Sequence, residues 1–584
     1  MRTNRALLFL LLALVAVANN AHAAVAKHKT AKKTSVQASR KSRGVVATKK
    51  KTVAAPALPP EPEIKREDEA PPPSPSDPDR ERILRVQEAL YSLVHGPVLG
   101  RVRTAIRVME ARSGRVLYSR RADTLMDPAS NQKILATAAS LYRLGNQFRY
   151  RTEVQGPAPD EEGEVKGDVV LRGSGDPALT ADNIEALANQ VALQGVSKVS
   201  GNIVADKRYL GADESSSTGR SPLSVSRSAI VVRVRPGASV KARPVVVYEP
   251  AVDGITISNR ATTVAGGRSR ISVTVGTQEG RISINVSGRI SIRQAGVVFR
   301  RRPSAPLLYA AALLAQSLNR RGVQITGGPL VREGNAKPAS ESAAPTTTVL
   351  AVHQSAPLPE LMRPINKNSN NEYADRLLET LGAQMYGGAP SMDKGVKALR
   401  SALAELGVPD ATYHSTNGSG LGHTNRISPD ALTNLLRTLY FDPRIGPELM
   451  QSLSVGGVDG TTKHRFTGSV ASHRVRAKTG TLNGKSCLSG YVGDESEILI
   501  FSIMVDRMGS RGVNSVRKAQ VRVVETLMGY AKGLVGDAAE ERPDPGTDFE
   551  AGEDVIETEE AEPVPATPNA DDPPAGPSSD PGGV

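Results

Sequence analysis

Residues 127–141 read DPASNQKILATAASL. This stretch decides the fold class because it combines a serine and a lysine three residues apart with the apolar pattern of a helix. Apolar residues recur at helical spacing from Ile134 onward, and Pro128 stands where a helix begins. Ser130 and Lys133 are three residues apart, so their side chains share one face of that helix. A lysine with a lowered pKa can take the proton that a serine must lose to attack. The stretch predicts a serine nucleophile with its base; taken alone, a helix-capping serine is the alternative.

Two further short motifs follow in order, S-N-N at residues 369–371 and K-T-G at residues 478–480. With S-N-Q-K at residues 130–133 they match the set found in serine acyl-transfer enzymes of the β-lactamase and penicillin-binding type. Each motif alone is weak, because S-M-D-K at 391–394 and S-V-R-K at 515–518 also satisfy S-x-x-K. The choice among them rests on context.

The second motif precedes a helix expected to begin near Glu372. We interpret Ser369 as a proton shuttle and Asn371 as a side chain that grips a substrate amide. A helix cap is the alternative interpretation.

The third motif follows an apparent strand, HRVRA, at residues 473–477. Gly480 would let a substrate backbone pass close to the sheet edge, so that an extended peptide adds as a strand. The hydroxyls of Thr479 and Thr481, with the charge of Lys478, can hold a terminal carboxylate. The Thr481 N–H can complete an oxyanion hole, and Lys478 can lower the pKa of the base. A hairpin turn with a surface lysine is the alternative.

The pattern along the chain predicts an α/β (α+β) fold with an insertion. Strands and helices suited to a catalytic domain occupy residues 80–155 and 345–535. Residues 156–344 differ in character, and within them RISVTV, RISINV and RISI alternate strictly. We therefore expect a largely β insertion, with a small antiparallel module at about residues 250–298.

The two ends of the chain are compositionally biased. Residues 1–23 have the charged, apolar and small-residue order of a secretory signal, with cleavage expected after Ala23 and no transmembrane anchor. A basic and then proline-rich linker at 24–79 and an acidic tail at 536–584 are expected to be disordered. These features predict a periplasmic or otherwise extracytoplasmic protein.

The charge of the body suggests an anionic partner. The formal net charge of the chain is +14, and residues 61–535 carry +16 once the biased ends are set aside. Nucleic acid is a poor candidate, because the chain has no Trp and few aromatic residues for stacking bases. An anionic envelope surface, reached through the basic arm, is the better expectation.

Composition also limits the chemistry. Cys487 is the only cysteine, so neither an intrachain disulfide nor a thiolate metal cluster is possible, and we expect a buried apolar role for it. The histidines lack H-E-x-x-H spacing, and no G-x-x-x-x-G-K-[ST] loop is present. We expect no metal and no cofactor.

The residues resemble the D-alanyl-D-alanine carboxypeptidase/endopeptidases, the class C low-molecular-mass penicillin-binding proteins. Beyond the three motifs, the resemblance covers roughly residues 82–535. It rests on DPASNQKILATAASL, RGSGDPALT with SGNIVAD, PLLYAAALLAQSL with GVQITGG, INKNSNNEYADRLLETLG, NGSGLGHTNRISP, GGVDGTTKHRF and AKTGTLNG. It implies a penicillin-recognising catalytic domain with an antiparallel sheet and helices, split by an insertion of about two hundred residues.

The resemblance also implies residue roles. Ser130 would be the acylated serine, Lys133 its base, and Ser369, Asn371 and Lys478 the partners in the second and third motifs. The implied activity is cleavage of D-alanyl bonds in peptidoglycan stem peptides or cross-links, with β-lactams as inhibitors. Relatives often carry a tryptophan-containing stretch after the position of Tyr209 and an acidic residue for the stem peptide, whereas this chain has no Trp.

The sequence is also compatible with two competing functions. A β-lactamase or esterase on the same fold would turn over its acyl-enzyme rapidly, and the large insertion argues against it. A non-catalytic wall-binding scaffold is favoured by the charged ends, and the intact Ser130, Lys133 and Lys478 argue against it.

Overall fold

The computed structural model describes most of the chain between residues 70 and 533. The described residues are 70, 72–206, 221–250, 252, 255–278, 281–332, 347–494, 496–509, 512–533 and 562–563. The predicted signal at 1–23, the basic arm and most of the proline-rich linker lie outside them, as does the predicted acidic tail apart from its two-residue strand β24 (Glu562–Pro563).

A six-stranded antiparallel sheet carries the third motif on β21, and the first two motifs lie at the starts of helices. Its order is β2-β1-β23-β22-β21-β20, so the N-terminal hairpin of the chain pairs with strands from its last hundred residues. This pairing joins two segments that the insertion separates in sequence. The strands are β1 (Arg103–Glu110), β2 (Val116–Arg120), β20 (Ser454–Val455), β21 (Val475–Leu482), β22 (Lys485–Gly493) and β23 (Ile498–Asp506).

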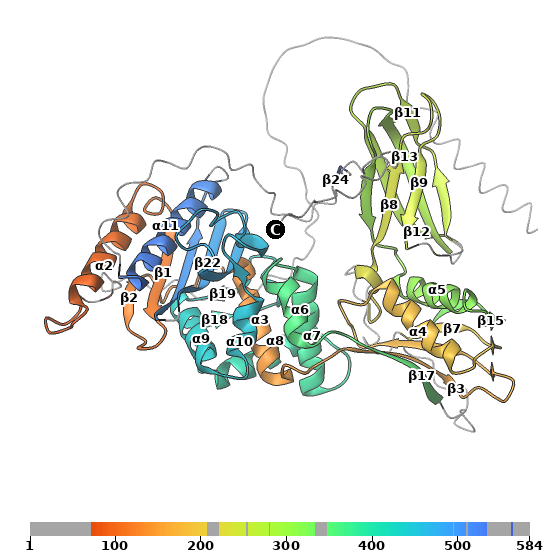
Figure 1. Ribbon diagram of the computed structural model, residues 1–584, viewed down its shortest axis with the longest axis horizontal. Helices are drawn as coiled ribbons and strands as arrows, with labels where there is room; N and C mark the ends of the chain where they lie inside the picture. Colours follow the sequence, from red (N-terminus) through yellow and green to blue (C-terminus); the bar gives the residue numbers. More distant parts are fainter. Residues whose placement is uncertain are drawn as a thin grey trace, which may run out of the picture. The chain divides into compact units, whose positions relative to one another are not determined.

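Helices cover both faces of this sheet (Figure 1). Alternation along β1 sends Ala105 and Met109 to one core and Ile106 and Val108 to the other. The second of these cores is closed by α2 (Arg80–His95) and α11 (Val513–Ala531). The first is closed by α3 (Gln132–Leu144), α6 (Leu358–Asn366), α7 (Asn371–Tyr386), α8 (Met392–Glu405), α9 (Pro429–Phe441) and α10 (Gly446–Ser452).

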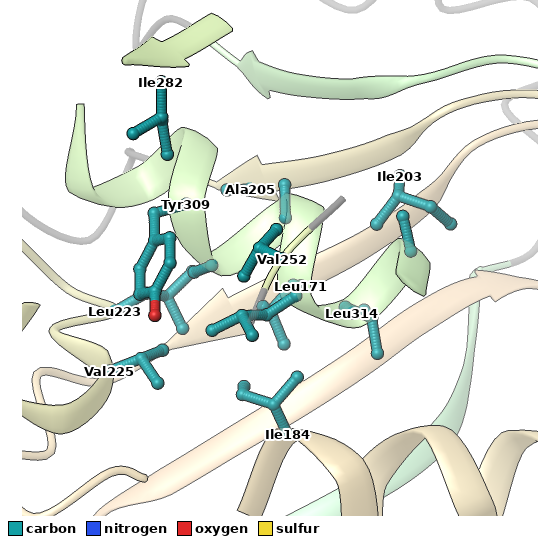
Figure 2. Close-up of a cluster of buried hydrophobic side chains, with 14 of the residues drawn as sticks. Leu171, Ile184, Ile203, Ala205, Leu223, Val225, Val252, Ile282, Tyr309 and Leu314 are labelled. Carbon is teal, nitrogen blue, oxygen red and sulfur yellow. The ribbon is translucent and has the colours of Figure 1, made fainter. Parts of the chain in front are cut away.

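The inserted region has its own core. A mixed sheet in the order β16-β7-β5-β3-β17 packs against α4 (Ala181–Leu193) and α5 (Pro306–Asn319). Figure 2 shows Leu171, Ile184, Tyr309 and Leu314 in this cluster. The strands are β3 (Arg151–Pro157), β5 (Val169–Gly173), β7 (Ile203–Asp206), β16 (Pro329–Arg332) and β17 (Thr347–Gln354); β4 (Glu164–Val165), β6 (Lys198–Val199) and β15 (Gln324–Ile325) form a small parallel sheet.

The β module within this region is larger than the sequence pattern indicated. It begins at β8 and contains two sheets, one in the order β14-β8-β9 and one built around β13. Two strands of the second sheet, β10 and β11, run parallel to β13, so the module is not purely antiparallel. The strands are β8 (Ile230–Arg235), β9 (Val245–Glu249), β10 (Thr256–Asn259), β11 (Thr262–Val264), β12 (Arg270–Gln278), β13 (Arg281–Ser291) and β14 (Val297–Arg301); β24 pairs with the start of β14.

Short elements complete the description of both regions. They are the 3₁₀ turns η1 (Ala129–Asn131), η4 (Val225–Ser228), η5 (Asp410–Thr412) and η6 (Gly460–Thr462), with β18 (Tyr413–His414) and β19 (Arg426–Ile427). No helix among the described residues combines the length and apolar character that a bilayer crossing requires.

Candidate active site

Ser130 lies in η1, one turn ahead of α3, rather than in the helix itself. The residue before it, Ala129, is buried with φ of 47°, a left-handed conformation that costs a non-glycine residue about 1–2 kcal/mol. The side chain of Asp127 accepts the Ala129 N–H at 2.9 Å. A Cβ at Gly420 would lie 1.9 Å from the Ala129 carbonyl oxygen, so a glycine is required where that loop passes the turn. The turn that carries Ser130 is therefore held in a strained shape by its surroundings.

Three oxygen atoms surround the amine of Lys133, which is fully buried. Its Nζ lies 3.0 Å from Ser130 Oγ, 2.7 Å from Asn371 Oδ1 and 2.6 Å from the Ser419 carbonyl oxygen. The side-chain amide oxygen and the backbone carbonyl can only accept hydrogen bonds. A neutral amine has two N–H groups, and giving them to those two oxygens turns its lone pair toward the Ser130 hydroxyl.

The electrostatics favour that neutral amine. Burial lowers the pKa of Lys133 to about 7, and the carboxylate of Asp375 opposes this shift. Burial likewise raises the pKa of Asp375, while hydrogen bonds from Ser419 and Gly418 and the charge of Lys133 act in the other direction. Asp375 Oδ1 accepts the N–H groups of Gly418 at 2.9 Å and Ser419 at 2.8 Å, which fixes the carbonyl that faces Lys133.

The second motif divides its side chains between cap and site. Asn370, the middle residue, caps α7 by accepting the Tyr373 N–H at 3.1 Å. Ser369 has φ of 60°, and its Oγ accepts a hydrogen bond of 3.0 Å from Lys478 Nζ. Asn371 contacts Lys133 as described above. The motif therefore links the first and third motifs, and its capping function belongs to Asn370.

The third motif lies on β21. The outermost strand, β20, has only two residues and pairs with the part of β21 that precedes the motif, so the motif itself lies at an open edge of the sheet. Lys478 is buried, and Thr479 Oγ1 donates to Thr461 Oγ1 at 2.7 Å. A Cβ at Gly480 would lie 2.7 Å from the Pro128 carbonyl oxygen, so glycine lets the turn that carries Ser130 pack on the strand. Thr481 Oγ1 accepts a hydrogen bond of 3.2 Å from Arg517 on α11.

The competing S-x-x-K stretches lie elsewhere. Ser391 caps α8 by accepting the Lys394 N–H at 3.3 Å, and Lys394 Nζ donates to the carbonyl oxygens of Gly387 and Ala389. Ser515 and Lys518 are both exposed on α11. Among the described residues, Ser130 and Lys133 alone of the three pairs are joined by a buried serine–lysine hydrogen bond.

Asp127 is a residue of the site that the motif analysis did not single out. Its buried carboxylate contacts Lys485 of β22, lies 3.2 Å from His423 Nδ1 and is 3.9 Å from Arg426. Three cations or potential cations thus surround the residue that holds Ala129. These contacts connect the turn that carries Ser130 to the β21–β22 hairpin and to the loop at residues 414–426.

Two other side chains near the motifs, Cys487 and Asp459, have structural roles. Cys487 is buried and unbonded to another cysteine, and burial raises the pKa of its thiol, as its predicted apolar role requires. Asp459 fixes a turn by accepting the Val455 N–H at 2.8 Å, and it also pairs with Lys367. Within the described residues there is no grouping of three or more metal-ligating side chains.

The sequence analysis did not single out two residues that contact or influence Lys133, Asp375 and Ser419, and only Asp375 could have been found from a sequence pattern. Asp375 lies four residues after Asn371, so helical spacing alone places both on one face of α7. Ser419 accepts a hydrogen bond from Lys133 through its backbone carbonyl oxygen, and a pattern of side-chain types cannot predict a contact made by the backbone.

Comparison with known proteins agrees with the enzyme class that the motifs indicate. A model of the D-Ala-D-Ala carboxypeptidase 3 (S13) family matches residues 86–527. A D-alanyl-D-alanine carboxypeptidase of Actinomadura sp. (strain R39) is 33% identical over 458 residues, which cover 74% of this chain and 83% of that protein. The D-alanyl-D-alanine carboxypeptidase DacB of Haemophilus influenzae is 25% identical over 392 residues, covering 63% and 78%.

A solved structure shares the fold. The crystal structure of penicillin binding protein 4 (dacB) from Haemophilus influenzae, complexed with a novel β-lactam, has a TM-score of 0.61 and 21% identity, covering 75% of this chain and 98% of that one. The fold is that of a penicillin-recognising serine hydrolase, as the sequence predicted. The chain belongs to the D-Ala-D-Ala carboxypeptidase 3 (S13) family, which confirms the resemblance and the enzyme class drawn from its motifs.

Proposed function

We propose that this chain is an exported serine-type D-Ala-D-Ala carboxypeptidase that acts on peptidoglycan stem peptides, with Ser130 as nucleophile and Lys133 as general base. The observation that carries the two roles is the buried Lys133 amine, whose three oxygen contacts include Ser130 Oγ at 3.0 Å. Because the other two contacts only accept hydrogen bonds, the neutral amine is set to receive the Ser130 proton.

The first step is formation of an acyl-enzyme. Ser130 Oγ attacks the carbonyl carbon of the penultimate D-alanine while its proton moves to Lys133 Nζ. Negative charge develops on the carbonyl oxygen, which the backbone N–H groups of Ser130 and Thr481 would stabilise. The C–N bond of the scissile peptide then breaks, leaving the acyl group as an ester on Ser130.

The leaving amine needs a proton, and the second and third motifs supply a route. Ser369 Oγ lies 3.0 Å from Lys478 Nζ, so the hydroxyl can pass a proton to the amine and be reprotonated by the ammonium group. Asn371 holds the substrate amide with its remaining side-chain group. Water then attacks the ester and passes its proton through Ser369 to Lys478, while the Lys133 ammonium returns its proton to Ser130 as the ester C–O bond breaks. The shortened peptide is released as an acid, and both lysines return to their starting protonation states.

The outer edge of β21 is the proposed substrate-binding strand. β20 pairs only with Arg476 and Ala477, which leaves residues 478–482 without a strand partner on that side in the described part of the chain. An extended peptide adding there would bring its terminal carboxylate to Thr479, Gly480 and Thr481. When the leaving amine belongs to a neighbouring stem peptide, the same chemistry is a DD-endopeptidase reaction, and we propose that both occur.

The rest of the chain fits an extracytoplasmic enzyme. The signal predicted at residues 1–23 would send the chain to the periplasm or the cell exterior, and the basic arm could contact an anionic envelope surface. We further propose that the segments before β3 and after β17 form the catalytic domain. The insertion is then slightly longer than the expected residues 156–344, because β3 and β17 pair within its sheet and contribute Val154 and Ala351 to its core. No cofactor or metal has a role in the proposed steps, and β-lactams would act as inhibitors by acylating Ser130.

Covalent labelling with a fluorescent penicillin tests the assignment. The wild-type chain should be labelled at Ser130, as read by gel and intact mass, and Ser130→Ala should show no label. D-Alanine release from a small soluble D-Ala-D-Ala peptide should fall at least about a thousandfold in Ser130→Ala. Ser391→Ala, in the helix-capping S-x-x-K stretch, is the matched control and should keep both activities.

The alternatives predict other results. Rapid release of hydrolysed penicillin from the enzyme would identify a β-lactamase. A folded wild-type chain that neither binds penicillin nor hydrolyses it nor releases D-alanine would sink the catalytic assignment and favour a wall-binding scaffold.

A further inference from the structure

The positive charge of the folded body is concentrated in the β module. Residues 230–302 contain thirteen Lys and Arg residues against three acids, a net +10 out of the +16 carried by residues 61–535. Twelve of the thirteen are arginines, whose planar guanidinium groups bind carboxylates and phosphates through paired hydrogen bonds. The basic character of the chain is therefore a local property of one part of the insertion.

The strand register places eight of these cations at one end of the module. β8 ends where β9 and β14 begin, and the ends of β13 and β11 lie beside the start of β12. The loops at this end are also joined to each other, since Lys241 N donates to Thr263 O at 2.8 Å and Ile292 N donates to Val264 O at 2.8 Å. In Figure 1 β11 marks this end of the module. The cations, here called the basic end, are Arg235, Lys241, Arg243, Arg260, Arg268, Arg270, Arg289 and Arg293.

The basic end has no acidic ion-pair partner among the described residues, although the acidic segment β24 pairs with the start of β14. All eight side chains are exposed, and within the described part of the chain none of them has an acidic side chain within ion-pair distance. Arg270 and Arg289 are direct cross-strand partners of β12 and β13, an arrangement in which like charges repel. A surface that concentrates repelling charges is costly to the free protein and is relieved by an anionic partner.

We propose that the basic end is a docking surface for the carboxylate-bearing chains of peptidoglycan, separate from the active site. The inference rests on the proposed function, because it takes the polymer on which Ser130 acts as the partner. Free carboxylates recur along the stem peptides of that polymer, so several arginines can engage one strand together. Such multivalent contact raises the local concentration of scissile bonds without changing the catalytic step.

The neighbouring side chains favour this polymer over other polyanions. Ser272, Thr274, Asn285 and Ser287 are exposed on the outward face that Arg270 and Arg289 share, and they can bind the hydroxyl and amide groups of a glycopeptide. The large exposed apolar residues of this end are the aliphatic side chains Val240, Val245 and Ile292, which do not form the broad apolar face that insertion into lipid needs.

Nucleic acid is disfavoured by the absence of stacking residues. The only aromatic residues of the module are Tyr248, which is partly buried, and Phe299, which is buried. No described aromatic side chain of the module is therefore presented as a platform for bases.

The test compares two quadruple variants of the full chain in a Ser130→Ala background, which leaves the polymer intact. One variant removes the basic end by Arg268→Gln, Arg270→Gln, Arg289→Gln and Arg293→Gln. The control removes four exposed arginines outside the module by Arg101→Gln, Arg112→Gln, Arg172→Gln and Arg522→Gln. Both lose the same formal charge. Binding is measured by co-sedimentation with purified insoluble peptidoglycan at low and high salt, and thermal unfolding confirms folding.

We expect the basic-end variant to bind peptidoglycan about tenfold or more weakly at low salt, with the control close to the parent and the difference disappearing at high salt. The basic-end variant should be no less thermostable than the parent, because it removes a like-charge pair. With Ser130 restored, both variants should release D-alanine from a small soluble peptide at the wild-type rate.

Several results would overturn the proposal. Equal binding by the basic-end variant would do so, as would an equal loss in the control, which would indicate a net-charge effect. Binding of the parent to phosphatidylglycerol vesicles or duplex DNA but not to peptidoglycan would assign the surface to another partner. Failure of the soluble-peptide assay in the wild type would instead reject the proposed function, and the sedimentation result would stand by itself.

Discussion

The amine of Lys133 is buried from solvent and is surrounded by three protein oxygens. Because burial lowers its pKa to about 7, the fraction of neutral amine rises with pH through that value. The ammonium form below it cannot accept the Ser130 proton. The acylation rate by penicillin should therefore increase with pH and level off above a midpoint near about 7, as measured by stopped-flow labelling. A rate independent of pH over this range would contradict a titrating Lys133.

Asp375 affects the same amine in two separable ways. Its charge stabilises the ammonium form, and its Oδ1 orders the backbone N–H groups of Gly418 and Ser419. Asp375→Asn keeps an acceptor oxygen and removes the charge, so the pKa of Lys133 should fall and the acylation midpoint should move to lower pH.

The same pH profile distinguishes this effect from a purely structural one. Asp393→Asn, on the exposed first turn of α8, is the matched control and should leave the midpoint unchanged. A lower rate for Asp375→Asn with an unmoved midpoint would mean that the carboxylate acts only by ordering the loop.

At the scale of elements, the site depends on how closely η1 packs on β21. Gly480→Ala would introduce a Cβ 2.7 Å from the Pro128 carbonyl oxygen and so push the turn that carries Ser130 away from the strand. A displacement on the order of 1 Å is expected to reduce acylation by roughly a hundredfold. Gly266→Ala is the control, since nothing lies within 4 Å of the added atom. Wild-type acylation by Gly480→Ala would show that the turn tolerates this shift.

The local structure at Ser130 differs from the helix that the sequence predicts. Sequence periodicity predicts a helix starting beside Pro128, whereas α3 begins at Gln132 and Ser130 precedes it in a 3₁₀ turn. The turn is shaped by the hydrogen bond from Ala129 N to Asp127 and by the glycine at 420. Neither constraint is visible in a local pattern, because both partners of the turn are set by tertiary contacts.

At the scale of the whole molecule, two sets of cores are separated in sequence. The core of the inserted region is built from residues between Val154 and Ala351, and those of the catalytic sheet from residues outside that span. We expect calorimetry to show two unfolding transitions. Penicillin acylation should raise only one of them, because the acylated Ser130 lies among the catalytic elements. Ser130→Ala is the control that should show no shift, and a joint rise of both transitions would indicate that the two parts unfold together.

The sequence by itself determined the fold class, the family and the members of the three motifs. These depend on local spacing and on residue types, such as Ser130 three residues before Lys133, that are legible without coordinates. It also placed the start of α7 near Glu372, next to the observed start at Asn371, because the helical pattern of apolar residues begins there.

Only the tertiary structure decided which of those residues lie together. In one of the three S-x-x-K stretches it buries Lys133 against Asn371 and the Ser419 carbonyl oxygen, which lie 238 and 286 residues away along the chain. It assigned the cap to Asn370 and brought the dispersed arginines of the β module to one end. The physical reason is that a pKa, a hydrogen-bond partner and a surface charge density depend on distances in space, which a local pattern does not specify.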